Sequence, residues 1–556
     1  MYITILRRLV PLSLVLLNAC SAGDGAHAQD APEGEVATAQ QDTGVPLYDN
    51  LGDHHFAVRA SDRAQRYFDQ GMRLYYAFNH AEAIRAFNEA ARLDPDCAMC
   101  YWGTALSYGP NINMPMDSAS GVAAYEAIRQ AVARQASAAP GESALIGALA
   151  VRYAKVPPAD RAPLDSAYAR AMAEVAEQYP DHPEVQSLYA ESLMDLSPWQ
   201  YWNRDGSPRP ATPAILAALE KVIAAQPNHP GANHFYIHAV EAVDPERAVP
   251  MAENLAGLMP GAGHLVHMPG HIYVRVGRYE DAIRANEHAV HADESFIADH
   301  RPGVGVYTLG YYPHNYDFLS FAASMIGRSA QALDAADRMA ALVKPEMLGA
   351  PGLTVLQNHL SRALQIRVRF SRWQEILDAA EPPAVAPYAR AIWHYARGRA
   401  FAANGDVESA VAELAGLRTA ASDASLQNAP IEFNPATALL AIAANVLDGH
   451  IAAARGDYAV AIQRLTAAAA GEDDLVYGEP PEWTVPVRHD LGNVLLKAGR
   501  AADAEAAFRE DLRRFPENGW SLDGLARSLT AQGRAAEAAE VRQRFEKSWR
   551  TADVKM

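Results

Sequence analysis

A recurring interval of 34 residues constrains this sequence more than any other feature. Counted from Ala64, small residues, one aromatic residue and a final proline occupy positions 8, 20, 24, 27 and 32 of the unit: Gly71, Ala83, Phe87, Ala90 and Pro95. The same frame returns, more or less completely, from six later starting points: His229, Gly263, Ala391, Ile442, Val485 and Gly519. A unit of this length holds one pair of helices, which cannot bury its apolar face alone. The pairs are therefore expected to stack on one another as an array.

The frame from Val485 repeats the pattern with Gly492, Ala504, Phe508 and Pro516. This pattern resembles the tetratricopeptide repeat, in which small residues let two antiparallel helices approach and proline ends the second helix. The resemblance covers about half of the chain and is spread over most of it. It implies an all-α, right-handed superhelix with a concave groove, and a scaffold that binds a protein or peptide partner there.

Between the frames, residues 143–179 and 356–379 are amphipathic and rich in Ala and Leu, as degenerate repeats are. No run alternates apolar and polar residues long enough to indicate a sheet. The Pro-rich stretch Glu381–Pro387 is expected to be a break. We therefore expect an N-terminal array with insertions over residues 48–380 and a more regular C-terminal array over residues 388–552.

The first twenty residues are typical of an export signal rather than of a folded element. Arg7 and Arg8 precede a short apolar core, Leu9–Leu17, which is too short to span a bilayer permanently. The core ends at Leu17-Asn18-Ala19-Cys20, which resembles a lipobox, although Asn18 departs from the usual pattern. We favour lipidation at Cys20, because the apolar core stops directly before it.

A second cleavage position lies after Ala28, and its use would give a soluble periplasmic protein instead. If Cys20 is the lipidated residue, Ser21 follows it, and by resemblance to Gram-negative lipoproteins this directs the protein to the outer membrane, facing the periplasm. Residues 21–47 are rich in Ala, Gly, Asp and Gln, which predicts a flexible tether. The lipid would then be the chain's sole contact with the membrane.

The charge balance argues against nucleic acid as a partner. There are 48 basic and 66 acidic side chains, a net charge of −18 at pH 7. Such a surface repels phosphate backbones, and no basic stripe overrides it.

With Cys20 assigned to lipid, Cys97 and Cys100 are the remaining thiols. No histidine follows this Cys-x-x-Cys, which excludes covalent haem attachment. In an oxidising compartment the pair is expected to form a local disulfide. A redox pair, or a soft metal site with nearby methionines, is the alternative.

Histidines are concentrated in one part of the sequence, with ten of the nineteen between His229 and His314. His264, His267 and His271 occupy positions 2, 5 and 9 of the frame from Gly263. At 100° per residue these three side chains share an arc of about 60° on a helix. In the preceding frame, His234, His238 and Glu241 at i, i+4 and i+7 also share one narrow arc. First helices of successive repeats are neighbours, so the two sets are expected to converge on a common pocket, with His314 near its rim. The candidate metal ligands are His234, His238, Glu241, His264, His267, His271 and His314.

Imidazoles spaced i, i+4 with a carboxylate suit Zn²⁺, Cu²⁺ or Fe²⁺. The segment His234–His238 lacks the glutamate after the first histidine that zinc proteases use as a base. Buried histidines also cap helices, bond to carbonyl groups or line peptide-binding grooves, and this alternative stays open. The segments 229–238 and 264–271 resemble hallmarks of a bacterial subgroup of exported tetratricopeptide lipoproteins; that resemblance supplies no catalytic residue.

No nucleophile elbow, phosphate-binding loop or dinucleotide fingerprint lies in a suitable context, so no catalytic motif is recognised. Asn111, Asn113, Tyr236 and Tyr273 are weak candidates for contacts to a ligand in the groove, and turn capping is the simpler explanation for the two asparagines. Two functions are consistent with these features. The first is a periplasm-facing scaffold for a protein or peptide; the alternative is a metal-dependent enzyme or metal carrier.

Overall fold

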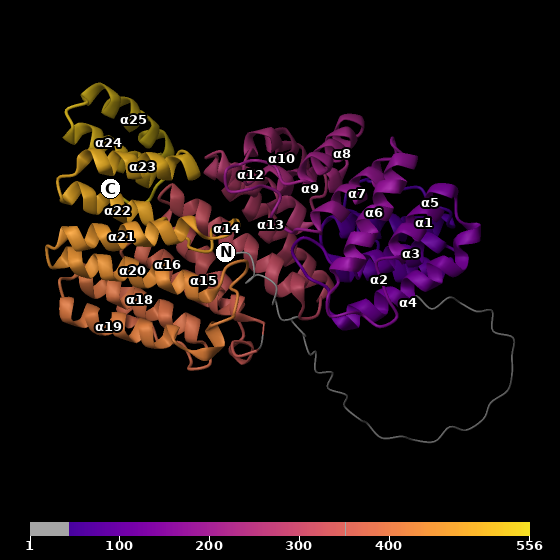
Figure 1. Cartoon of the computed structure of the whole chain (residues 1–556), viewed down its shortest axis with the longest axis horizontal. Coiled ribbons are helices and arrows are strands. Elements are labelled where there is room, and N and C mark those ends of the chain that lie inside the picture. Colours follow the sequence, from indigo (N-terminus) through magenta and orange to yellow (C-terminus); the bar gives the residue numbers. More distant parts are fainter. Residues whose placement is uncertain (1–43, 351) are drawn as a thin grey trace, which may run out of the picture. The chain divides into compact units, whose positions relative to one another are not determined.

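Antiparallel helices that follow one another along the chain make up the fold (Figure 1). The computed structural model describes residues 44–350 and 352–556. The expected signal peptide, Cys20 and most of the expected tether lie outside the described residues. Within the described residues, extended pairing is limited to three isolated bridges, so the expected all-α class is confirmed.

The contacts within the chain group the described residues into two units. The first comprises residues 44–49, 55–75 and 79–180, and the second comprises residues 50–54, 76–78 and 181–556. The first unit is built on α1 (Asp62–Tyr76), whose last residue belongs to the second unit, α2 (His80–Leu93), α3 (Ala98–Ser107), α4 (Ser118–Arg134), α5 (Pro140–Ala150) and α6 (Ala162–Gln178).

The N-terminal half of the second unit contains helices of uneven length, from 5 to 22 residues. They are α7 (Pro183–Met194), α8 (Thr212–Ala225), α9 (Pro230–Val240), α10 (Val249–Leu255), α11 (Gly263–His267), α12 (Pro269–Arg275), α13 (Tyr279–His300), α14 (Tyr312–Met325), α15 (Ser329–Ala341), α16 (Thr354–Arg369) and α17 (Trp373–Asp378). The later helices form four regular pairs, from orange to yellow in Figure 1: α18 (Pro387–Ala403), α19 (Val407–Ala421), α20 (Ala436–Ala454), α21 (Tyr458–Asp473), α22 (Val487–Lys497), α23 (Ala501–Arg514), α24 (Gly519–Ala531) and α25 (Ala535–Ser548).

Each of the seven 34-residue frames coincides with one helix pair, and in the frame from Gly263 the first helix of the pair is divided into α11 and α12. This agreement confirms the tetratricopeptide-like repeat. The small residues act as expected. A Cβ atom on Gly71 or Gly103 would lie 2.6 or 2.4 Å from the ring of Phe87, so only glycine lets this ring fill the gap between helices. Gly492 and Gly524 surround the ring of Phe508 in the same way.

First helices of successive pairs pack in a row through the second unit. The row runs α7, α9, α11 with α12, α14, α16, α18, α20, α22 and α24, and each member contacts the next. The histidine-bearing segments α9, α11, α12 and α14 are consecutive members of this row. Their side chains can therefore meet although the chain between them is long.

The Pro-rich stretch 381–387 connects α17 to α18, and both of these helices belong to the second unit. Among the described helices, α20 alone is long and apolar enough to cross a membrane. Its side chains Leu439, Val446 and Leu447 are buried in the core that it shares with the neighbouring pairs. Such burial is what the core helix of a repeat array requires.

Candidate metal centre

Six histidines and one glutamate meet inside the second unit. His234 and His238 come from α9, His264 and His267 from α11, His271 from α12 and His314 from α14, while Glu241 ends α9. His314 is half-buried, and the other side chains of this set are at most 2% exposed. They form two groups of three histidines whose ligand atoms lie within 4.8 Å of one another: His234, His238 and His264, and His267, His271 and His314. We call these triad one and triad two.

Local sequence explains how the donors are presented. Pro230 starts α9 and His229 caps it, so His234 and His238 fall one turn apart on the same face. The other segment is divided between two short helices, since α11 ends at His267 and α12 begins at Pro269.

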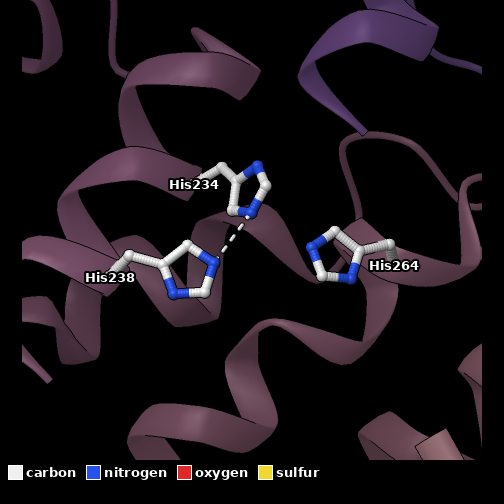
Figure 2. A group of neighbouring side chains, drawn as sticks. All are labelled: His234, His238 and His264. Carbon is white, nitrogen blue, oxygen red and sulfur yellow. Dashed lines mark hydrogen bonds between the residues drawn. The ribbon is translucent and has the colours of Figure 1, made fainter. Parts of the chain in front are cut away.

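In triad one the hydrogen bonds fix which ring nitrogen carries the proton. His234 Nδ1 lies 2.7 Å from the carbonyl oxygen of Tyr76, and His238 Nδ1 lies 3.2 Å from Glu241 Oε1. Both partners only accept, so each Nδ1 donates and each Nε2 of a neutral ring keeps its lone pair. These two Nε2 atoms face each other at 3.1 Å (Figure 2). His264 points toward them from the neighbouring segment (Figure 2).

Triad two repeats this arrangement. His267 Nδ1 lies 2.8 Å from Asn286 Oδ1, and this amide is oriented by its own donation to the carbonyl of Ala282. His271 Nδ1 lies 2.7 Å from Glu241 Oε2. The Nε2 atoms of His267 and His271 then face each other at 2.9 Å.

Two lone pairs at such distances repel unless a cation lies between them. Two nitrogens bound to one tetrahedral ion at 2.0–2.1 Å would be separated by about 3.3 Å, close to both observed values. Within the described residues, neither ring nitrogen of the buried His264 has a hydrogen-bond partner. Buried polar atoms are rarely left in this state without a role.

Protonation is a poor alternative to a metal ion here. Burial first, and the neighbouring histidines second, hold the pKa values of His234, His264 and His267 well below their ordinary value. Burial also lowers the pKa of His238. The Glu241 carboxyl shows the opposite balance, because burial raises its pKa but His271 and His238 bring it down to about 2. His234, His238, His264 and His267 are therefore neutral imidazoles beside an ionised carboxylate.

Aromatic rings surround the centre and keep it dry. Phe78 stacks on His264 with ring centroids 5.4 Å apart, and Phe318 lies 4.6 Å from both His267 and His271. Such an apolar wall limits solvent access and fixes the ring orientations.

A third cluster, His54, Glu184 and His229, has a structural role. His229 Nδ1 accepts the backbone N–H of Ala232, which caps α9, so its Nε2 carries the proton and donates to Glu184 Oε1 at 3.1 Å. Tyr76 donates its hydroxyl proton to the same carboxylate. Because His229 has no free lone pair in this state, the cluster orients α9 and differs from the two triads.

Two sequence candidates lie apart from the histidines in the chain and make local contacts. Cys97 and Cys100 are joined in a disulfide at the start of α3. Asn111 closes a turn, since its side-chain oxygen accepts the backbone N–H groups of Asn113 and Met114. The disulfide and the Asn111 turn are both local arrangements that contain no triad residue.

The two tyrosine candidates make local contacts as well. Tyr236 lies on α9 and donates its hydroxyl proton to Glu220 at 2.9 Å. Tyr273 lies under the guanidinium of Arg278, 4.5 Å from the ring centroid. Neither belongs to a triad.

Four contributors to the centre have no motif of their own. Tyr76, whose carbonyl contributes, is the last residue of α1, and Phe78 lies in the turn that follows. A carbonyl partner leaves no mark in the sequence. Asn286 on α13 and Phe318 on α14 are the others. Asn286 gives one usable signal, since it is a fully buried polar residue inside an apolar helix face.

No known family model matches the chain, and no curated protein matches it significantly. Solved structures that resemble it include the human IFIT1 dimer with m7Gppp-AAAA, at 14% identity and a TM-score of 0.33, covering 88% of this chain and 91% of that one. The Cut9–Hcn1 hetero-tetramer of the APC/C is 13% identical, with a TM-score of 0.31, over 85% of this chain and 78% of that one. The P58(IPK) TPR domain is 10% identical, with a TM-score of 0.21, over 85% of this chain and 99% of that one. Because these identities and TM-scores are low, the fold is assigned from the helix pairs of this chain alone.

Proposed function

We propose that this chain is a metalloprotein in which a tetratricopeptide-like array holds a transition-metal centre, acting as a metal-dependent enzyme or a metal carrier. The facing Nε2 lone pairs of His234 and His238, and of His267 and His271, carry this proposal. In His234, His238 and His267 the opposite nitrogen hydrogen-bonds a carbonyl, a carboxylate or an amide oxygen, as it does in histidines that ligate metals. In His271 the opposite nitrogen makes an ion-pair contact of 2.7 Å with Glu241.

The donor set favours copper or zinc over iron. Imidazole suits all three, but non-haem iron usually has a carboxylate among its ligands. Glu241 instead faces the Nδ1 atoms of two rings, which leaves the proposed ligands all neutral. Three histidines also leave one position of a tetrahedral ion for an external ligand, which suits catalysis or metal transfer better than a closed structural site.

We propose further that the protein is exported and anchored by lipid at Cys20, as the signal-like segment before it indicates. A histidine-rich metal centre of a periplasm-facing lipoprotein would then receive its ion outside the cytoplasm.

Metal analysis of the purified protein tests the metal proposal. After removal of metal and reloading with Cu²⁺ or Zn²⁺, the wild type should retain at least one ion per chain through gel filtration. The double variant His238→Ala/His271→Ala should retain none, because each triad loses a ligand. His288→Ala/His291→Ala is the matched control, since both side chains are exposed on α13, outside the triads. A wild type that retains no ion, or a triad variant that binds as well as the control, would overturn the proposal.

A scaffold that binds a protein or peptide is the second candidate. A pocket of about 690 Å³ with many apolar side chains, Val343, Leu348, Leu360 and Leu364 among them, lies between α15, α16 and α17. In this role the buried histidines would not touch the partner, because a peptide cannot reach side chains that are at most 2% exposed. Charged substitution of Leu364 should then abolish partner capture and leave metal retention intact.

A further inference from the structure

We infer that the centre holds two metal ions, one in each triad, and that Glu241 positions both triads through a single carboxylate. This inference rests on the proposed metal-binding function. It specifies how many ions are bound and which residue orients both sites.

Each triad is complete by itself. Triad one takes its i, i+4 pair from α9 and its third histidine, His264, from the next first helix, α11. Triad two takes its pair from α11 and α12 and its third histidine, His314, from the next first helix, α14. The repeat therefore generates the same site twice, one step apart along the row of first helices. No histidine has to serve both sites.

One ion cannot use both facing pairs. The Nδ1 atoms of His238 and His271 both point at Glu241, 3.2 Å from Oε1 and 2.7 Å from Oε2. The two nitrogens of an imidazole lie on opposite sides of the ring, so each Nε2 points away from the carboxylate and toward its own pair. The carboxylate thus stands between the triads, and the Nε2 pairs lie beyond the rings on either side of it.

Glu241 links the two sites because Oε1 accepts the Nδ1 proton of His238 and Oε2 makes an ion-pair contact with His271 Nδ1. Rotating the carboxylate to improve one contact would weaken the other, so the rings of His238 and His271 are oriented together. Its single negative charge is also the charge closest to both proposed ions within the set, and it offsets their mutual repulsion. Carboxylate partners of this type raise the basicity of a ligating imidazole and fix its tautomer.

The substitution Glu241→Gln tests this role. An amide has one acceptor oxygen, so it can accept the Nδ1–H of one histidine while its NH₂ group faces the other. That second ring must change tautomer, which puts its proton on Nε2 and removes a metal ligand. We expect two ions per wild-type chain, and in Glu241→Gln a 10- to 100-fold weaker affinity for at least one of them. Glu241→Asp, which keeps the charge but shortens the reach, should show the same loss and tests the role again if the glutamine variant fails to fold.

Asp511→Asn is the matched control. Asp511 is also a buried carboxylate that hydrogen-bonds a histidine, His489, at 2.9 Å, but it lies on α23 and touches no triad. This variant should still bind two ions with wild-type affinity. With Cu²⁺ as the probe, electron paramagnetic resonance should show an altered signal in Glu241→Gln and an unaltered one in Asp511→Asn, which general destabilisation would not produce.

The outcomes separate the two proposals. A wild type that binds no Cu²⁺ or Zn²⁺ defeats the metal-binding function itself. Saturation at one ion per chain leaves that function standing and defeats the two-ion inference. His264→Phe and His314→Phe should each lower the count by one, and equal loss of both ions in either variant would mean that the triads form one site. Two ions with unchanged affinity and spectrum in Glu241→Gln would overturn the role of Glu241.

Discussion

Single side chains decide what the centre can bind, and the neutral histidines are the clearest case. His234, His238 and His267 each have a partner that accepts the Nδ1 proton, and neither ring nitrogen of His264 has a hydrogen-bond partner among the described residues. A buried ring in this state resists protonation, so the proposed site would take up a metal ion at neutral pH without first releasing protons.

The free energy of unfolding of the metal-free protein should therefore fall as the pH is lowered from about 7.5 to 5. The pKa of His264 lies well below its ordinary value of 6.5 in the folded chain, owing to burial first and other histidines second. In the unfolded chain the ring takes up a proton near pH 6.5, while in the folded chain it stays neutral, so acid favours unfolding. Each such ring contributes a slope that approaches about 1.4 kcal/mol per pH unit below pH 6.5.

Urea titrations at several pH values, with a chelator present, measure this slope. His264→Phe keeps a ring against Phe78 but removes one titrating group, so the slope should decrease by up to about 1.4 kcal/mol per pH unit. Equal slopes in the two proteins would show that His264 takes up its proton at the same pH in the folded and unfolded states, which would contradict the prediction.

At the level of the helix pair, close approach at glycine determines stability. The ring of Phe508 occupies the space left by Gly492 on its own partner helix and by Gly524 on the next first helix. The same geometry recurs around Phe87, so one side chain joins two consecutive repeats in each case.

Gly492→Ala should lower the free energy of unfolding by about 1–3 kcal/mol, because the new Cβ would lie 2.4 Å from the Phe508 ring and force the helices apart. Gly257→Ala is the control, since no atom lies within 4 Å of its added Cβ and its φ is not positive. That control should stay within about 0.5 kcal/mol of the wild type. Denaturant unfolding of both variants checks the prediction, and equal stabilities would contradict the packing argument.

For the molecule as a whole, the N-terminal sequence bears on where the proposed metal centre would operate. All triad ligands lie in the second unit, well after the segment that is expected to carry the lipid. An anchor of this kind would hold the centre at the membrane surface without placing any triad helix in the bilayer.

We predict that Cys20 is acylated and that the protein fractionates with the outer membrane. Growth with a clickable fatty acid should label the wild type, and Cys20→Ser should abolish the label because the acceptor thiol is lost. Mass spectrometry of the mature N-terminus gives the second readout. An unlabelled protein that starts at Gln29 would show cleavage after Ala28 and a soluble periplasmic form.

Much of the fold could be predicted from sequence, because the repeat is a local property. The spacing of Gly71, Phe87 and Pro95 records contacts within one helix pair and with the next, and the pattern recurs wherever a pair forms. Helical periodicity likewise placed His234 and His238 on one face, since their positions depend only on the pitch of the helix. The concentration of histidines between residues 229 and 314 pointed to the right part of the chain.

Tertiary structure decided everything that depends on distant segments meeting. Only the packed row of first helices divides the histidines into two groups of three, joining His264 to the pair on α9 rather than to its own neighbours in the sequence. The Tyr76 carbonyl that sets the tautomer of His234 lies 158 residues away, and a backbone carbonyl is present at every residue and so gives no signal. Glu241 was recognisable as an acidic neighbour of His238, but its contact with His271 exists only because α12 packs against α9. Local periodicity determines which face of a helix a side chain occupies, whereas the partner it meets there depends on how the helices stack.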